Sequence, residues 1–156
     1  MRFPRAIRLD DSDSRIFERA ADPGEWAVPG SFAFAEVTPE ELTGKRRQAF
    51  VQGFLGTRSF GRTTLVEVAE IDAEDFEDVI ERLALHFISD YGAPDLAAAR
   101  PPARAEAEFA AGLCDHKLHT LLVLERELTV EGVVDRFRVV APRASSHARM
   151  WSIDDD

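Results

Sequence analysis

The chain has 156 residues, a formal net charge of −10, and 45% hydrophobic and 31% charged residues. A length of this order predicts one domain, which can bury a hydrophobic core without the support of a disulfide or a metal ion. The acidity argues against nucleic-acid binding, because neutralising phosphate groups requires a basic surface. The most basic segment is Lys45-Arg46-Arg47, with Arg58 and Arg62 downstream, and such a short run is usually the solvated side of a helix.

The cysteine count and the apolar runs indicate the cellular setting. Cys114 is the only cysteine, and a chain without an internal disulfide is typical of a reducing compartment. The basic residues 1–5 are not followed by the apolar segment of a signal peptide. No apolar run approaches the ~20 residues of a membrane span. We therefore expect a cytoplasmic protein without membrane contact.

The first 37 residues are expected to form a meander of short strands. Asp22-Pro23-Gly24 and Val28-Pro29-Gly30-Ser31 place proline and glycine where tight turns need them. The strands expected around these turns contain Ile7, Ile16-Phe17, Trp26-Ala27-Val28 and Phe32-Ala33-Phe34.

A helix start follows at Thr38-Pro39-Glu40-Glu41. Thr38 suits the N-terminal cap and Glu41 can return the second bond of a capping box. One helix or a pair of helices then runs towards Phe54, with Gly56 as the C-terminal cap. Residues 62–71, rich in Thr and Val, are expected to form a strand.

Two longer helices are expected in the second half. The first begins at the capping residue Asp72 and has an acidic outer face. Its apolar residues recur at helical spacing: Phe76, Val79, Ile80, Leu83, Phe87 and Tyr91. The proline-rich residues 93–103 form a linker or a short helical turn. The second helix runs from about Pro102 to Leu113, with Ala105, Phe109 and Leu113 on its buried face.

The last two strands are expected to form a hairpin that turns at Glu131-Gly132. In that register two oppositely charged pairs lie across the strands, Glu127 with Arg136 and Glu125 with Arg138. The other face pairs Leu124 with Val139 and Arg126 with Phe137.

The segment Cys114-Asp115-His116-Lys117-Leu118-His119 gathers the only cysteine and two of the four histidines. A zinc site would use Cys114, His116 and His119. Structural zinc usually takes four ligands in two short-spaced pairs, and a fourth ligand would have to come from His86 or His147. We expect no metal and no cofactor.

Two other interpretations of this segment remain. Cys114 activated by an imidazole would be a nucleophile. Alternatively, the segment ends a helix, where His116 and Lys117 complement the helix dipole and Cys114 is a small core residue. The last interpretation is the one that the pattern favours. His86, on the flank of the acidic helix, is expected to be a solvated or a boundary residue. Arg126 is the one hairpin arginine without an evident carboxylate partner.

Part of the sequence resembles a family of small uncharacterised proteobacterial proteins. The resemblance is carried by Ile7-Arg8-Leu9-Asp10, Phe17-Glu18-Arg19-Ala20, Gly24-Glu25-Trp26-Ala27-Val28 and Phe32-Ala33-Phe34, and it continues to about Pro142. It implies a bacterial cytoplasmic protein with a domain of unknown function, and it implies no catalytic residue.

These patterns predict a single α+β domain over residues 1–143. Its antiparallel sheet is expected to contain the N-terminal meander, the strand at 62–71 and the C-terminal hairpin, with two or three helices packed on one face. Residues 144–156 form a tail that ends in Met150, Trp151 and Ile153. These apolar groups should anchor the tail on its own domain, on a neighbouring molecule or, as we favour, on a second subunit.

Two functions of different classes stay open. The favoured one is a non-catalytic accessory or protein-interaction module that forms a homodimer, because no G-x-S-x-G, H-E-x-x-H or G-x-G-x-x-G pattern occurs. The alternative is a small-molecule-binding protein or enzyme with a pocket near His116 and His119, lined also by Arg126 or Trp26. The substrate, the reaction and the protein partner are left open.

Overall fold

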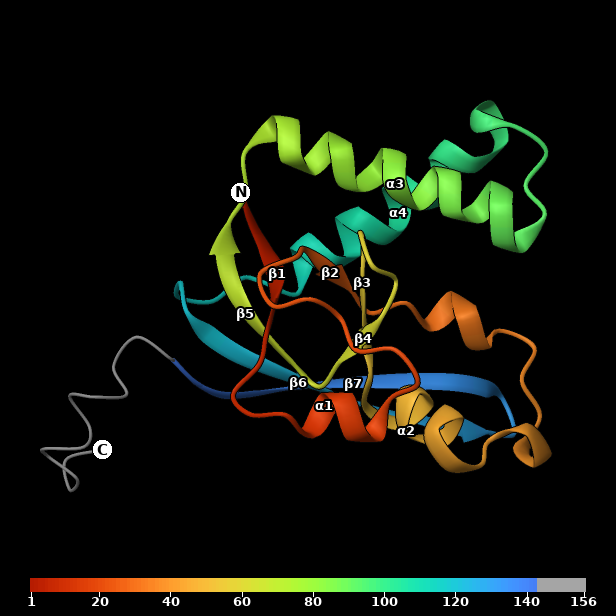
Figure 1. Cartoon of the computed structure of the whole chain (residues 1–156). Helices are drawn as coiled ribbons and strands as arrows, with labels where there is room; N and C mark the ends of the chain where they lie inside the picture. Colours follow the sequence, from red (N-terminus) through yellow and green to blue (C-terminus); the bar gives the residue numbers. More distant parts are fainter. Residues whose placement is uncertain (143–156) are drawn as a thin grey trace, which may run out of the picture.

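The computed structural model describes residues 1–142, and Figure 1 shows the course of the chain. The expected anchors of the tail at residues 144–156 therefore lie outside the described residues. The elements are β1 (Arg2–Ile7), α1 (Ser12–Ile16), β2 (Ala27–Val28), the 3-10 turns η1 (Ser31–Phe34) and η2 (Pro39–Glu41), α2 (Gly44–Gln52), β3 (Phe54–Gly56), β4 (Arg62–Thr63), β5 (Leu65–Glu70), α3 (Ala73–Tyr91), α4 (Leu96–Gly112), β6 (Thr120–Thr129) and β7 (Gly132–Pro142).

Within residues 1–142 the strands form two antiparallel sheets. The larger has the order β1-β5-β6-β7 and the smaller the order β2-β3-β4. The predicted α+β class with an antiparallel sheet is confirmed. The residues expected as one sheet are divided between the two, since Trp26-Ala27-Val28 contributes to the smaller sheet and residues 62–71 break at Thr64 into β4 and β5.

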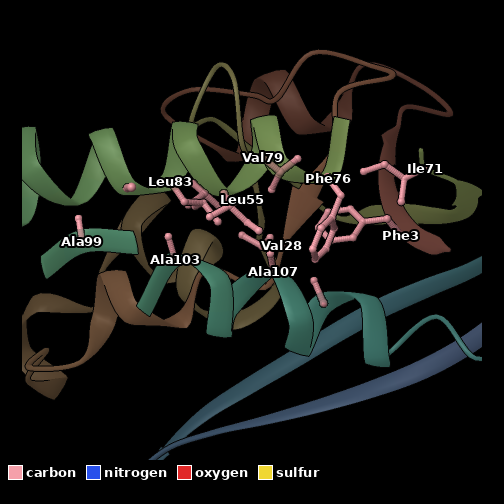
Figure 2. Packing of buried hydrophobic residues seen from close by; sticks show 13 residues of the cluster. Phe3, Val28, Leu55, Ile71, Phe76, Val79, Leu83, Ala99, Ala103 and Ala107 are labelled. Carbon is pink, nitrogen blue, oxygen red and sulfur yellow. The ribbon is translucent and has the colours of Figure 1, made fainter. Parts of the chain in front are cut away.

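Helices α3 and α4 lie side by side over the strands (Figure 1). The main core lies beneath and between them, and Figure 2 shows its members pointing towards one another. Strand residues Phe3, Val28 and Leu55 meet α3 there, and α4 contributes small side chains. The residues of α3 and α4 that Figure 2 labels in this cluster are Phe76, Val79, Leu83, Ala99, Ala103 and Ala107. None of the helices in the described range has the length and apolar character that a membrane crossing requires.

Helix α3 begins as its sequence predicts. The Asp72 carboxylate accepts a hydrogen bond from the Asp75 backbone N–H at 2.7 Å, which satisfies one of the donors that a helix start leaves open. The capping box is also confirmed, because the Thr38 N–H donates to Glu41 Oε1 at 2.8 Å. It opens the short turn η2, and α2 follows as a separate helix, so of the two arrangements expected the pair is correct.

Helix α4 differs from its prediction. It begins at Leu96, after the cap Asp95, and continues through Pro101 and Pro102. Proline removes a backbone donor from a helix interior, and here the packing of α4 against α3 outweighs that loss. The buried face is an alanine stripe: Ala99, Ala103, Ala107 and Ala110. The predicted face was wrong, because Ala105 and Phe109 are exposed.

Three local expectations in the first half were also wrong. Ile16 ends the helix α1 and Phe32-Ala33-Phe34 lies in η1, where strands had been expected. Gly56 does not cap a helix but pairs in β3, because α2 already ends at Gln52. Asp13 explains why helix α1 forms where a strand had been expected. Its buried carboxylate accepts hydrogen bonds from Thr63 Oγ1 and from the Thr64 hydroxyl. That contact joins positions far apart in the sequence.

The hairpin register was predicted wrongly by two residues. Thr129 pairs with Gly132 across a turn at residues 130–131, Glu125 lies opposite Arg136, and Arg126 lies opposite Asp135. The expected ion pairs form nevertheless, but diagonally. Arg136 contacts Glu127, and Arg138 lies 3.5 Å from Glu125. Charge complementarity between the strands therefore did not fix the register.

Candidate functional site

The candidate site is a cavity of about 210 Å³ that we call the arginine pocket. Five segments meet around it: the chain after α1, η1, α2, the chain that leads into β4, and the end of α3. The residues that line it are Glu18, Arg19, Ala33, Phe34, Lys45, Arg46, Ala49, Phe60, Arg62 and Tyr91.

The charge of this lining is opposite to that of the chain. It contains the cations Arg19, Lys45, Arg46 and Arg62 and a single carboxylate, Glu18. Among the described residues none of the four cations takes part in an ion pair. An electropositive concavity on an acidic protein concentrates anions locally.

Arg62 is the buried member of the group. The residue is 9% exposed, and its guanidinium donates to the backbone carbonyls of Gly53 at 3.0 Å and Gly30 at 3.5 Å. Burial, with the positive charge of Arg126 as the next cause, lowers the pKa of Arg62 to about 9. A buried cation that binds only neutral carbonyls keeps part of its desolvation cost, which a bound anion would offset.

Three arginines surround the ring of Phe34. The guanidinium carbons of Arg62, Arg126 and Arg46 lie 4.9, 5.3 and 5.7 Å from its centroid. Contacts of this length are favourable cation–π interactions. The ring, itself 3% exposed, therefore holds like charges together at one place.

Arg126, a candidate from the sequence, lies outside the lining of this pocket. Its side chain is fully buried and forms an ion pair of 3.0 Å with Asp135, its partner across the hairpin. It also donates to the carbonyls of Phe50 at 2.7 Å and Pro29 at 2.8 Å. Its donors are thus used by protein oxygens, which is the arrangement of a structural arginine.

An aromatic group forms another side of the arginine pocket. Phe60 stacks on His86 with 3.9 Å between ring centroids and 9° between planes. Tyr91 meets His86 edge-on at 5.4 Å. The pKa of His86 is lowered, chiefly by burial, with Arg62 acting in the same direction and Asp90 against it.

The Cys/His segment is not a single site. Cys114 is 1% exposed and packs in a second core with Val66 and Leu122. Burial raises the pKa of its thiol to about 12, so a nucleophilic thiolate is disfavoured. Exposed His116 contributes its backbone carbonyl to a hydrogen bond from Arg2.

His119 has a different partner. Its Nδ1 lies 2.7 Å from Oε2 of Glu67, a carboxylate with 0% exposure that also pairs with Arg5 at 3.1 Å. Val66, beside Glu67 in β5, points to the core that holds Cys114, and neighbouring strand residues point to opposite faces. The thiol and this imidazole are therefore separated by the sheet. Among the described residues no three or more His, Cys, Asp or Glu side chains are arranged to hold a metal ion.

Trp26 lines another cavity, of about 260 Å³, together with Glu25 and Arg58. Its ring meets Phe3 edge-on at 6.0 Å. Glu25 shapes this cavity by accepting bonds from the backbone N–H groups of Arg58 and Ser59. Trp26 and Arg126 thus line different cavities, and neither His116 nor His119 lines either of them.

The sequence contained a partial signal for the arginine pocket. Lys45-Arg46 and Arg62 stood out as the most basic residues, but a run of cations alone fits a solvated helix. Phe34 and Tyr91 gave no such signal, because aromatic residues at these positions also suit a core. Their meeting depends on the fold.

Comparison with models of protein families identifies a match for this chain. The model of the Family of unknown function (DUF6505) matches residues 1–153. No curated protein and no solved structure matches the chain. The expected resemblance to a domain of unknown function is confirmed. Since the match covers nearly the whole sequence, the chain belongs to the Family of unknown function (DUF6505).

Proposed function

We propose that the protein binds a small anion in the arginine pocket. The observation that carries this proposal is Arg62, a buried guanidinium without a carboxylate partner among the described residues, at a cavity lined by three further unpaired cations. Arginine is well suited to this role because its planar fork matches carboxylate and phosphate oxygens.

The arginine pocket gathers four cations that have no ion pair among the described residues. The sequence has 29 acidic and 19 basic residues, so carboxylates are abundant. Some exposed arginines use them, such as Arg100 with Glu81 at 3.0 Å and Arg104 with Glu77 at 2.7 Å. Others, such as Arg47, form no ion pair among the described residues, so it is the gathering of four such cations at one cavity that distinguishes the pocket. An acidic chain that leaves four cations unpaired at one cavity is arranged to accept an anion from outside.

The lining supports binding rather than catalysis. Its ten residues include no histidine, cysteine or serine, and only Glu18, Lys45 and Tyr91 among them could transfer a proton. The proposal is therefore a binding protein, within the class of small-molecule-binding proteins but with a pocket that neither His116 nor His119 lines.

Calorimetric titration of the full chain with inorganic phosphate, sulfate, acetate and benzoate tests this function. We expect at least one of these anions to bind the wild type and to raise its melting temperature, because a ligand of the folded state stabilises it. Arg46→Ala and Arg62→Met should weaken binding at least tenfold. Arg47→Ala, an exposed neighbour on α2 outside the pocket lining, is the matched control.

Arg46 is exposed, so its variant should fold even if the Arg62 variant does not. The proposal fails if the wild type binds none of these anions. It also fails if folded Arg46→Ala binds them as tightly as the wild type does.

A second candidate function is a protein-interaction module that forms a homodimer, and one surface favours it. Strand β7 is an edge of the larger sheet and pairs only with β6 within residues 1–142. It exposes Val139 and Val140, at 45% and 49%, and unpaired edges of this kind can add strands from another chain. The proposal includes a cytoplasmic setting, because a chain with a single cysteine forms no internal disulfide and is typical of a reducing compartment.

The mass of the protein in solution at micromolar concentration tests this candidate. We expect a dimer that Val139→Lys converts to a monomer, with exposed Val130→Lys at the hairpin turn as control. A monomeric wild type would exclude it and would leave the proposal of anion binding unaffected.

A further inference from the structure

The arginine pocket has two chemically different sides, which narrows the class of its ligand. Arg19, Lys45 and Arg46 supply positive charge, and Phe60 and Tyr91 supply aromatic rings. A site for a bare inorganic anion needs only the first side. The aromatic side is informative because the backbone of Phe60 is strained and the exposed ring of Tyr91 is packed against other rings.

Phe60 has a strained backbone. Its φ is 57°, in the left-handed region that is a rare outlier for a bulky residue. The next residue has to be glycine, since a side chain at Gly61 would come within 2.5 Å of the Ala20 backbone. Strain of this kind clusters at binding sites. Here it accompanies a ring that forms part of the cavity wall.

Tyr91 is an exposed ring that is nevertheless fixed. It is 47% exposed, yet it meets Phe32 and His86 edge-on, each with 5.4 Å between centroids. The stacking of His86 on Phe60 joins the two rings into one aromatic group. A fixed ring beside a cavity offers contact area at little cost in conformational entropy.

The size of the cavity limits the ligand. A volume near 210 Å³ lies below the range of ~300–1,000 Å³ for drug-sized ligands. A single ring with one acidic group matches a space of this size, and a larger ligand would extend beyond it.

Resting on the proposed anion binding, we propose that the ligand is a single-ring aromatic carboxylate. Its carboxylate would bind Arg62 and Arg46, and its ring would lie against Phe60 and Tyr91. A guanidinium recognises the planar carboxylate, and edge-to-face or offset contacts with the aromatic group select the ring.

The test compares benzoate, cyclohexanecarboxylate and inorganic phosphate by calorimetric titration of the full chain. Cyclohexanecarboxylate has the same charge and a similar size but no π system. We expect benzoate to bind about three- to tenfold more tightly than cyclohexanecarboxylate, the range that aromatic contacts beyond simple burial give, and more tightly than phosphate.

The variant Tyr91→Leu should reduce this preference for benzoate to less than about twofold, since it removes a ring and keeps an apolar side chain. Phe109→Leu, at an exposed ring of α4 outside the pocket lining, is the matched control and should keep the preference.

Each outcome decides between the two proposals. If benzoate and cyclohexanecarboxylate bind equally, or if phosphate binds most tightly, the aromatic ligand is excluded and anion binding stands. If Tyr91→Leu keeps the full preference for benzoate, the aromatic ligand is likewise excluded. If none of the three binds but sulfate or acetate does, only the aromatic ligand is excluded. If none of these anions binds, or if binding survives Arg46→Ala in a folded protein, both proposals fail.

Discussion

Arg62 and Arg126 contact the same phenylalanine ring but differ in what neutralises them. Arg126 has the carboxylate of Asp135 at 3.0 Å and several carbonyls. The hydrogen bonds of Arg62 go to backbone carbonyls. Carbonyls carry no net charge, and the carboxylate of Glu106 acts on Arg62 without forming an ion pair with it, so only Arg126 has a carboxylate in direct contact. This contrast separates a structural arginine from one that is available to a ligand.

Replacing Arg126 should therefore be costly. Arg126→Met leaves Asp135 and the carbonyls of Phe50 and Pro29 without their donor, and we expect a loss of about 3–5 kcal/mol in the free energy of unfolding. Urea denaturation measures it. Arg138→Met, at a side chain that is 62% exposed, is the control and should cost less than about 1 kcal/mol. Equal losses would contradict the structural role of Arg126.

His86 should make stability depend on pH. Its folded pKa is lowered, first by burial, so the unfolded chain takes up the proton first as the pH falls. The neutral His86 ring therefore makes its full contribution to the free energy of unfolding above about pH 6.5. This contribution is lost as the pH falls through the folded pKa.

Urea denaturation at about pH 7.5 and about pH 5.5 measures this dependence. We expect the wild type to lose more stability than His86→Gln over this interval, since all other groups titrate alike in both proteins. An equal loss in the two proteins would show that burial does not lower the pKa of His86.

At the scale of elements, the packing of α4 on α3 depends on small side chains. Ala99, Ala103, Ala107 and Ala110 are each 0% exposed, and Figure 2 shows the first three directed into the core that α3 covers. Small residues allow two helices to approach closely, and the pairs Arg100–Glu81 and Arg104–Glu77 connect their exposed sides.

Enlarging one of these alanines should destabilise the protein. Ala103→Leu forces extra methyl groups into a filled interface, and we expect a loss of about 1–3 kcal/mol in the free energy of unfolding. Ala105→Leu on the exposed face of the same helix is the matched control and should stay within about 0.5 kcal/mol. Thermal or urea unfolding distinguishes the two, and similar losses would contradict this packing.

At the scale of the whole molecule, the charge of −10 opposes compactness through self-repulsion. Raising sodium chloride from about 20 mM to about 200 mM shortens the range of this repulsion. We expect the free energy of unfolding to rise, because the exposed ion pairs that salt also weakens contribute little. Urea denaturation at the two salt concentrations measures the change.

The double variant Glu36→Gln with Glu131→Gln tests the cause of that rise. Both acids are exposed and have no ion pair among the described residues. Replacing them therefore makes the net charge less negative without breaking an ion pair. The rise with salt should be smaller in this variant than in the wild type. A stability that falls with salt would show that attraction between charges dominates.

Prediction from the sequence succeeded where the deciding contacts are local. Asp72 caps α3 through Asp75, and Glu41 returns a bond to Thr38, each across three residues. The apolar stripe of α3 likewise needs only the helical repeat, and Phe76, Val79, Ile80 and Leu83 are buried as predicted. These features and the α+β class follow from hydrogen bonding and periodicity within short stretches of chain.

Tertiary structure decided the remaining features because their contacts join distant positions. Thr63 and Thr64 bind Asp13 across fifty and fifty-one residues, which sets α1 and the break between β4 and β5. The hairpin register gives Arg126 its partner Asp135, a choice that the charge pattern alone left ambiguous. The arginine pocket assembles residues from position 18 to position 91. Burial of Arg62 there is a property of the assembled fold, since desolvation depends on every group that surrounds a charge and not on its neighbours in the sequence.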